Sequence, residues 1–139
     1  MLKPVVIVLG LVISLPAWSQ GIEPGEWEFN ANTTSPLFPK AQNTVFTRCI
    51  KKEDAENPER WMARQSQNGD CKLTPGERTA DSMKWEMACA KGNMKGSGIA
   101  RITGPGTLES EMHMTGEIHG QRIRMNTRTL GRRLGPCKS

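Results

Sequence analysis

Histidine is the first residue type to consider for chemistry, and the chain has two, His113 and His119. They are six residues apart in one expected strand, which at about 3.3 Å per residue separates their side chains by roughly 20 Å. This distance excludes a metal ion shared by both. Neither histidine has a nucleophile and an orienting carboxylate patterned around it, as a general base requires. We therefore expect no enzyme, unless Glu53, Asp54 or His113 lines one buried cleft.

The run Met112-His113-Met114 places thioether and imidazole groups side by side, and these are soft ligands that hold copper. Alternation along a strand, however, sends the two methionine side chains to the face opposite His113. The three groups therefore cannot converge on one ion, and the sequence predicts neither a metal site nor any other cofactor.

Methionine is more common than the aromatic residues, with eight Met against three Phe, four Trp and no Tyr. Flexible thioethers fill irregular space in a core and also suit surfaces that accept varied apolar ligands. The apolar residues expected on the inner face of the sheet therefore have two interpretations. One is an ordinary packed core, which we favour because inward apolar residues need no ligand, and the other is a concave site for a lipid-like ligand. The candidate ligand-binding residues are Met83, Trp85, Met87, Met112, Met114 and Met125.

Basic residues gather at the end of the chain, where residues 121–139 contain no Asp or Glu. Such a face could bind an anionic component of a cell envelope, such as lipid phosphates. The alternative, which we favour, is cross-strand pairing with Glu109, Glu111 and Glu117. Nucleic acid is not expected as a partner, because a stripe of stacking aromatic residues is missing. The candidate anion-binding residues are Arg122, Arg124, Arg128, Arg132 and Arg133.

Apolar and polar residues alternate through the second half of the chain, which predicts four successive strands. The first two, from Met83 to Cys89 and from Met94 to Ile102, are joined by a turn at Gly92-Asn93. Short connections favour an antiparallel meander that forms a curved sheet or an open barrel. The inward residues of the third and fourth strands are Leu108, Met112, Met114, Ile118, Ile123, Met125, Thr127 and Thr129.

The first half of the chain predicts shorter strands. Residues 26–31 alternate, residues 44–50 form a second short strand that holds Cys49, and a loop with two prolines spans residues 33–42. Another strand starts at Cys71 and is expected to break at Pro75-Gly76, because proline cannot donate to a strand ladder.

One short helix interrupts these strands. Asn57 followed by Pro58 is typical of a helix N-cap and first helical position, which predicts a helix over residues 58–65. The chain has 139 residues, of which 36% are hydrophobic and 24% charged, with a formal net charge of +5. These values are typical of one globular domain, which we expect over residues 20–139.

The four cysteines, at positions 49, 71, 89 and 137, have no CxxC spacing. Zinc sites usually place two ligands within a few residues of each other, so two disulfides are the favoured interpretation. Cys71 and Cys89 point to the core from neighbouring expected strands, which predicts their pairing. That leaves Cys49 to pair with Cys137.

Residues 1–19 are typical of a cleavable signal peptide. Lys3 precedes an apolar run from Val5 to Leu15, and small residues stand one and three positions before a cut after Ser19. The run is shorter than the roughly 20 apolar residues that span a bilayer. We therefore expect export to the periplasm and no transmembrane segment in the mature chain.

Several short motifs occur in a fixed order along the chain. They are Gly25-Glu26-Trp27-Glu28, Cys49 followed by Glu53-Asp54, Asp70-Cys71-Lys72, Trp85-Glu86-Met87-Ala88-Cys89 and Gly131-Arg132-Arg133-Leu134-Gly135-Pro136-Cys137. Together these motifs resemble one family of secreted proteobacterial proteins, the domain-of-unknown-function family 3617. The resemblance extends from Gly25 to Cys137 and implies a small exported Gram-negative protein without an assigned activity.

Together the sequence predicts an all-β periplasmic domain, stapled by two disulfides, that acts by binding and not by catalysis. Its expected partner is an anionic envelope component or a protein. The alternative is a small carrier of an apolar or lipid-like ligand. The sequence makes no prediction of the oligomeric state.

Overall fold

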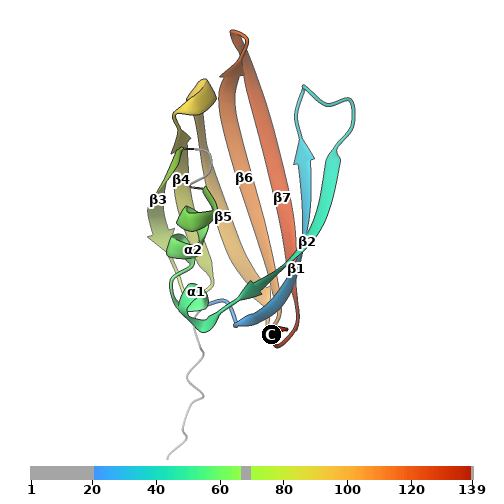
Figure 1. Cartoon of the computed structure of the whole chain (residues 1–139), viewed down its shortest axis with the longest axis vertical. Helices are drawn as coiled ribbons and strands as arrows, with labels where there is room; N and C mark the ends of the chain where they lie inside the picture. Colours follow the sequence, from blue (N-terminus) through green and yellow to red (C-terminus); the bar gives the residue numbers. More distant parts are fainter. Residues whose placement is uncertain (1–20, 67–69, 139) are drawn as a thin grey trace, which may run out of the picture.

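The structure is a computed structural model, and it describes residues 21–66 and 70–138. Seven strands form one antiparallel sheet in the order β2-β1-β7-β6-β5-β4-β3 (Figure 1). The sheet does not close, so β2 and β3 are its two edges. The strands are β1 (Gly25–Thr34), β2 (Gln42–Ile50), β3 (Cys71–Arg78), β4 (Ser82–Cys89), β5 (Met94–Gly104), β6 (Thr107–Ile118) and β7 (Gln121–Gly135).

The sheet is strongly curved, and its concave side carries the helices. Figure 1 shows the lower parts of β1 and β2 crossing in front of the long strands, with α1 (Lys52–Glu56) and α2 (Pro58–Ser66) beside them. Strands β3 to β7 follow one another as a meander, and β1 then pairs with β7. The predicted curved antiparallel sheet is therefore confirmed.

The predicted helix is confirmed, and a second one precedes it. The Asn57 side-chain oxygen accepts a hydrogen bond from the backbone N–H of Arg60 at 3.2 Å, as an N-cap does. In addition to the predicted helix, the five-residue α1 occupies residues 52–56 and a 3-10 turn, η2, occupies Lys91–Asn93. The five-residue helix α1 is too short to show helical periodicity, and its N-cap residue makes no side-chain cap bond.

The expected break in β3 was also wrong. The strand continues through Pro75 and Gly76 to Arg78, with a register shift after Pro75. Because β3 is an edge strand, the missing N–H of proline can face away from the sheet.

The turn between β6 and β7 corrects two further expectations. His119 lies outside the strand, in a two-residue turn with Gly120, and both residues have positive φ, 50° and 76°. This is the backbone of a type I′ hairpin, whose two positive φ angles Asn or His next to Gly can adopt. Ile118, expected to point inward to the core, is 45% exposed because the hairpin tip extends beyond its packing partners (Figure 1).

Both predicted disulfides are present. Cys71 and Cys89 are directly opposite each other on β3 and β4, and their bond closes a short segment with a sequence separation of 18. Cys49 at the end of β2 bonds to Cys137 after β7, with a separation of 88. The second bond therefore fastens the end of the chain to an early strand.

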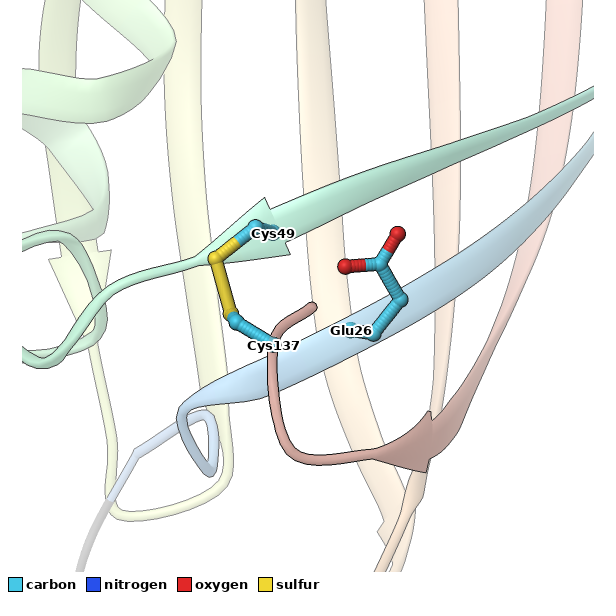
Figure 2. Close-up of side chains that lie close together, drawn as sticks. All are labelled: Glu26, Cys49 and Cys137. Atoms are coloured by element: carbon cyan, nitrogen blue, oxygen red, sulfur yellow. A yellow bond between two sulfur atoms is a disulfide. The ribbon is translucent and has the colours of Figure 1, made fainter. Parts of the chain in front are cut away.

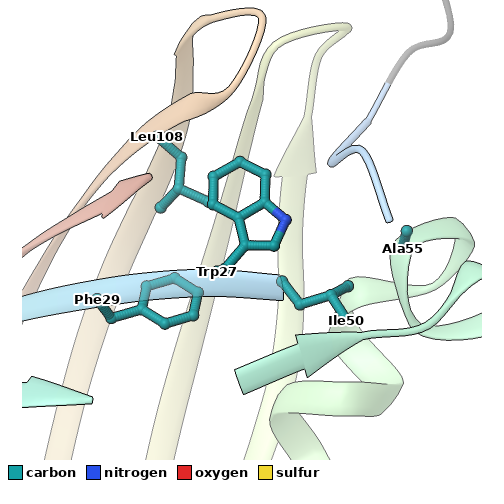
Figure 3. Close-up of a cluster of buried hydrophobic side chains, with 5 residues drawn as sticks. All are labelled: Trp27, Phe29, Ile50, Ala55 and Leu108. Carbon is teal, nitrogen blue, oxygen red and sulfur yellow. The ribbon is translucent and has the colours of Figure 1, made fainter. Parts of the chain in front are cut away.

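The most buried cluster lies where β1, β2, α1 and β6 meet. Figure 3 shows the aromatic ring of Trp27 between Leu108 and the end of β2, with Ala55 of α1 nearby. Trp27 is only 2% exposed, and its indole N–H donates to the Glu23 carbonyl at 2.9 Å. The cluster comprises Trp27, Phe29, Ile50, Ala55 and Leu108.

Glycines on the concave face make room for large side chains from neighbouring strands. Gly98 of β5 pairs with Trp85 of β4, and a methyl group at Gly98 would overlap the indole ring. Gly96 pairs with Met114 in the same way, and a methyl group there would overlap the Met114 sulfur. The alternation of glycine and bulky residue across strands therefore lets Trp85 and Met114 lie flat on the sheet.

This packing predicts that Gly98→Ala lowers the free energy of unfolding by about 1–3 kcal/mol, the usual cost of overpacking a core. Gly106→Ala is the matched control, because a methyl group there would be 3.5 Å from the nearest described atom, the Cβ of Arg133. It should leave stability unchanged or slightly raised. Urea denaturation of both variants measures the difference, and equal stabilities would contradict the packing of Trp85 over Gly98.

Candidate functional site

The concave face carries all six residues of the predicted ligand site. The strand registers place Met87, Met114 and Met125 in one row across the sheet, and Trp85 and Met112 in the next row. Met83, Trp85 and Met114 are buried, whereas Met87, Met112 and Met125 are half-buried. The face is thus partly core and partly accessible.

Trp85 has an unusual environment for a buried tryptophan. The residue is 4% exposed, and its indole N–H has no hydrogen-bond partner among the described residues. A buried donor without a partner costs about 1–3 kcal/mol. The other deeply buried tryptophan, Trp27, has a carbonyl partner. A bound molecule that offers an oxygen acceptor would remove this cost at Trp85.

A pocket of about 480 Å³ lies at the lower end of this face, next to Met83. Its walls include Ile22, Pro58 and Leu108, and its rim carries the charged residues Arg78 and Asp81. Of these residues, only Met83 is among the ligand-binding candidates predicted from the sequence, although Leu108 was predicted to point inward and Pro58 to begin a helix. They come from segments far apart in the chain, and no local spacing connects them.

Most of the five predicted anion-binding arginines lie on the convex face of the sheet. Arg128 forms an ion pair with Glu109 at 3.6 Å, and Arg132 forms one with Glu28 at 3.1 Å. Arg122 is directly opposite Glu117 in the β6–β7 pair.

The structure separates Arg133 from this group. Arg133 is opposite Trp27, on the concave side, where its guanidinium donates to the Pro24 carbonyl at 2.9 Å and lies 3.9 Å from Glu23. Four of the five arginines therefore share one face. Among these four, only Arg122 and Arg124 have no ion pair with a described residue.

Arg124 instead belongs to a row of positive charges that runs across the strands. Lys72 of β3, Lys95 of β5 and Arg124 of β7 are in register through Ala88 and Thr115. We call these three residues the basic row. All three are exposed, and none forms an ion pair with a described residue. The two lysines could not be grouped with Arg124 from the sequence, because only the strand register brings the three residues into one row.

His113 lies on the same convex face, in an open groove of about 660 Å³ that also borders Glu86, Ser97 and Glu111. Its Nδ1 lies 2.6 Å from the Asn126 side-chain oxygen, which is a hydrogen bond between β6 and β7. Ser97 is next to His113 in the register, and both side chains are exposed.

The structure does not bring Glu53, Asp54 and His113 into one buried cleft, which is the arrangement that would have indicated catalysis. Glu53 and Asp54 belong to α1 on the concave side, where Asp54 pairs with Arg64. His113 is on the opposite face of the sheet. The three residues therefore do not meet, and the expectation of a non-catalytic protein stays a prediction.

Glu26 is beside the Cys49–Cys137 disulfide. Figure 2 shows its carboxylate next to the two bonded sulfur atoms. One carboxylate oxygen and the two Sγ atoms all lie within 4.8 Å of one another. Two thiols and a carboxylate are a donor set suited to zinc, but sulfurs that are bonded to each other are not thiolate ligands. In this state the carboxylate acts on the disulfide through its charge.

The fold and its cross-links define the class of protein: a single curved antiparallel sheet with two short helices, held by two disulfides. The family model for "protein of unknown function (DUF3617)" matches residues 22–137, so the chain belongs to this family. The resemblance inferred from the motifs is thereby confirmed. No curated protein matches the sequence. Within residues 21–66 and 70–138, neither helix has the length and apolar character needed to cross a bilayer.

The position of Glu26 predicts slow reduction of the Cys49–Cys137 disulfide. Its negative charge repels both the attacking thiolate and the thiolate that leaves. An interaction of about 0.5–1 kcal/mol, usual for exposed charges, corresponds to about a two- to fivefold change in rate. Glu26→Gln should therefore speed reduction by dithiothreitol two- to fivefold.

The matched control is Glu28→Gln, on the same strand and face but paired with Arg132. It should leave the rate unchanged. Thiol alkylation followed by peptide mass analysis measures each disulfide separately. A rate that does not respond to Glu26→Gln would exclude this electrostatic protection.

Proposed function

We propose that this chain is an exported, non-catalytic binding domain of the cell envelope, whose convex face contacts an anionic component. Export is supported by the signal-peptide pattern of residues 1–19, which lie outside the described residues, and by the two disulfides, which persist in oxidising compartments. The binding role rests mainly on one observation, the basic row.

The basic row suits a surface or polymer with repeated negative charges. Its three residues stand on alternate strands, and four strand spacings of about 4.8 Å give a length of roughly 19 Å from Lys72 to Arg124. One phosphate cannot contact all three side chains at that spacing. An array of lipid headgroups or a phosphate-bearing polymer can. Each Lys or Arg near an anionic membrane contributes about 1 kcal/mol.

The basic row differs from Arg128 and Arg132 on the same convex face in having no ion pair with a described residue. Arg128 and Arg132 already have carboxylate partners, which lowers their attraction for an external anion. The sequence analysis favoured pairing over anion binding for the C-terminal arginines. For Arg128 and Arg132 the ion pairs agree with that preference, whereas Arg124 and the two lysines remain available.

A second candidate function is the transport of an apolar ligand on the concave face. It is favoured by the indole N–H of Trp85, which has no hydrogen-bond partner among the described residues, and by Met87, Met112 and Met125, which are half-buried on the same face. The adjacent pocket next to Met83 has a volume within the usual range for small-molecule sites. A fatty acid combines the alkyl chain and the oxygen acceptor that these groups require.

Vesicle binding tests the first function. The oxidised mature chain should bind vesicles that contain phosphatidylglycerol, and the affinity should fall steeply from 20 to 300 mM salt, values chosen to span the range in which counterions screen surface charge. Lys95→Gln with Arg124→Gln should weaken binding about tenfold or more, since two contacts are lost.

The control is Arg128→Gln with Arg132→Gln, which removes the same net charge from residues that are already paired. It should weaken binding less than about threefold. Binding that ignores salt, or equal losses in both double variants, would rule out the basic row as the contact.

Nuclear magnetic resonance tests the second function, with dodecanoate as the probe. Dodecanoate should shift the indole N–H signal of Trp85 and the methyl signals of Met112 and Met125. The Trp27 indole signal is the internal control, because its N–H already donates to Glu23. If dodecanoate at millimolar concentration leaves the Trp85 and methionine signals unchanged, the concave face is a packed core and not a carrier site.

A further inference from the structure

The two edges of the open sheet differ in how they are protected. Unpaired edges attract other strands, and proteins usually protect them with proline, lysine, a bulge or a covering helix. The β3 edge has all four: Lys72, Pro75, the register shift after Pro75, and α2 packed beside it. A strand from another molecule therefore has little access to β3.

The β2 edge lacks these features over most of its length. Residues 42–48 contain no proline, lysine or acidic residue, and the register with β1 is continuous from Gln42 to Ile50. Among the described elements, β1 is the one that packs extensively along β2. All of residues 42–48 except Phe46 are exposed. This is a long, regular edge with its outer backbone groups available.

Exposed apolar side chains gather around the same edge. Val45 is 57% exposed on β2, and Leu37 and Phe38 are 46% and 39% exposed in the loop that connects β1 to β2. Half of the large hydrophobic residues that are exposed in the described chain therefore belong to this one hairpin. Exposed apolar residues concentrated in one hairpin are typical of an interaction surface.

We propose that the β2 edge pairs antiparallel with the β2 edge of a second copy of this chain. The Thr47 carbonyl accepts a hydrogen bond from the Arg48 guanidinium, as expected of a carbonyl that faces the free edge. Alternation then directs the backbone groups of Asn43, Val45 and Thr47 to that edge. When Val45 lies opposite itself, Asn43 of each copy lies opposite Thr47 of the other. All three outward residues pair in this register.

The charge on β2 also favours a second copy. Arg48 is the single charged residue between Gln42 and Ile50. In the register centred on Val45, Arg48 of one copy lies opposite Gln42 of the other, so no like charges meet. The arrangement has two-fold symmetry, which is the commonest form of homodimer. It joins two seven-stranded sheets into one continuous sheet.

Sedimentation velocity of the oxidised mature chain tests this proposal. The wild-type protein should show a monomer–dimer equilibrium at micromolar to submillimolar concentrations, since one strand pair is a small interface. Val45→Glu and Val45→Lys should each raise the dimer dissociation constant at least tenfold, because like charges then meet at the symmetry axis. An equimolar mixture of the two variants should restore dimers, as heterodimers with opposite charges at that point.

Ile118→Glu is the control, because Ile118 is similarly exposed but lies at the tip of the β6–β7 hairpin. It should change the dissociation constant less than about twofold. Circular dichroism confirms that each variant is folded. The proposal is overturned if the wild-type chain stays monomeric throughout, which would leave β2 to a strand of another protein. It is also overturned if dimers form but do not respond to the charges at Val45.

Discussion

The bond between Cys49 and Cys137 is the constraint on which the rest of the structure depends. It joins the end of β2 to the segment after β7, and β1 lies between these two strands in the sheet. Three strands from opposite ends of the chain are thereby held in register. For a separation of 88 residues, the loss of chain entropy in the unfolded state is worth about 4 to 5 kcal/mol. That is a large fraction of the 5 to 15 kcal/mol that stabilises a typical domain.

The two faces of the sheet use different interactions. On the concave face, Trp85 and Met114 lie over glycines, and the aromatic cluster around Trp27 fills the space under α1. On the convex face, arginines and glutamates pair across strands, and the basic row has no carboxylate partner among the residues that the structure describes. A thin, single-layer domain therefore obtains its core from one side only. The other side carries mainly charged and polar side chains.

Local patterns predicted those parts of the fold that depend on local interactions. The alternation from Met83 to Cys89, the Gly92-Asn93 turn and the Asn57 cap each depend on neighbours in sequence, and each is present. The pairing of β1 with β7 was not predicted, because no short-range signal connects two segments at opposite ends of the chain. The basic row and the pocket next to Met83 were not predicted for the same reason, since their residues come from segments that are far apart in the chain. Helix α1 was missed because five residues are too few for a periodic pattern.

The adjacency of β1 and β7 has a consequence for how the chain reaches this structure. Strand β1, at the start of the fold, cannot pair with β7 until this last strand has been synthesised. Such non-local pairing is slow, because a long loop must close before any contact is gained. The segments that form β1 and β2 therefore stay without their neighbour in the sheet until the C-terminal segment is present, so completion of the sheet is the last event in the folding of this chain.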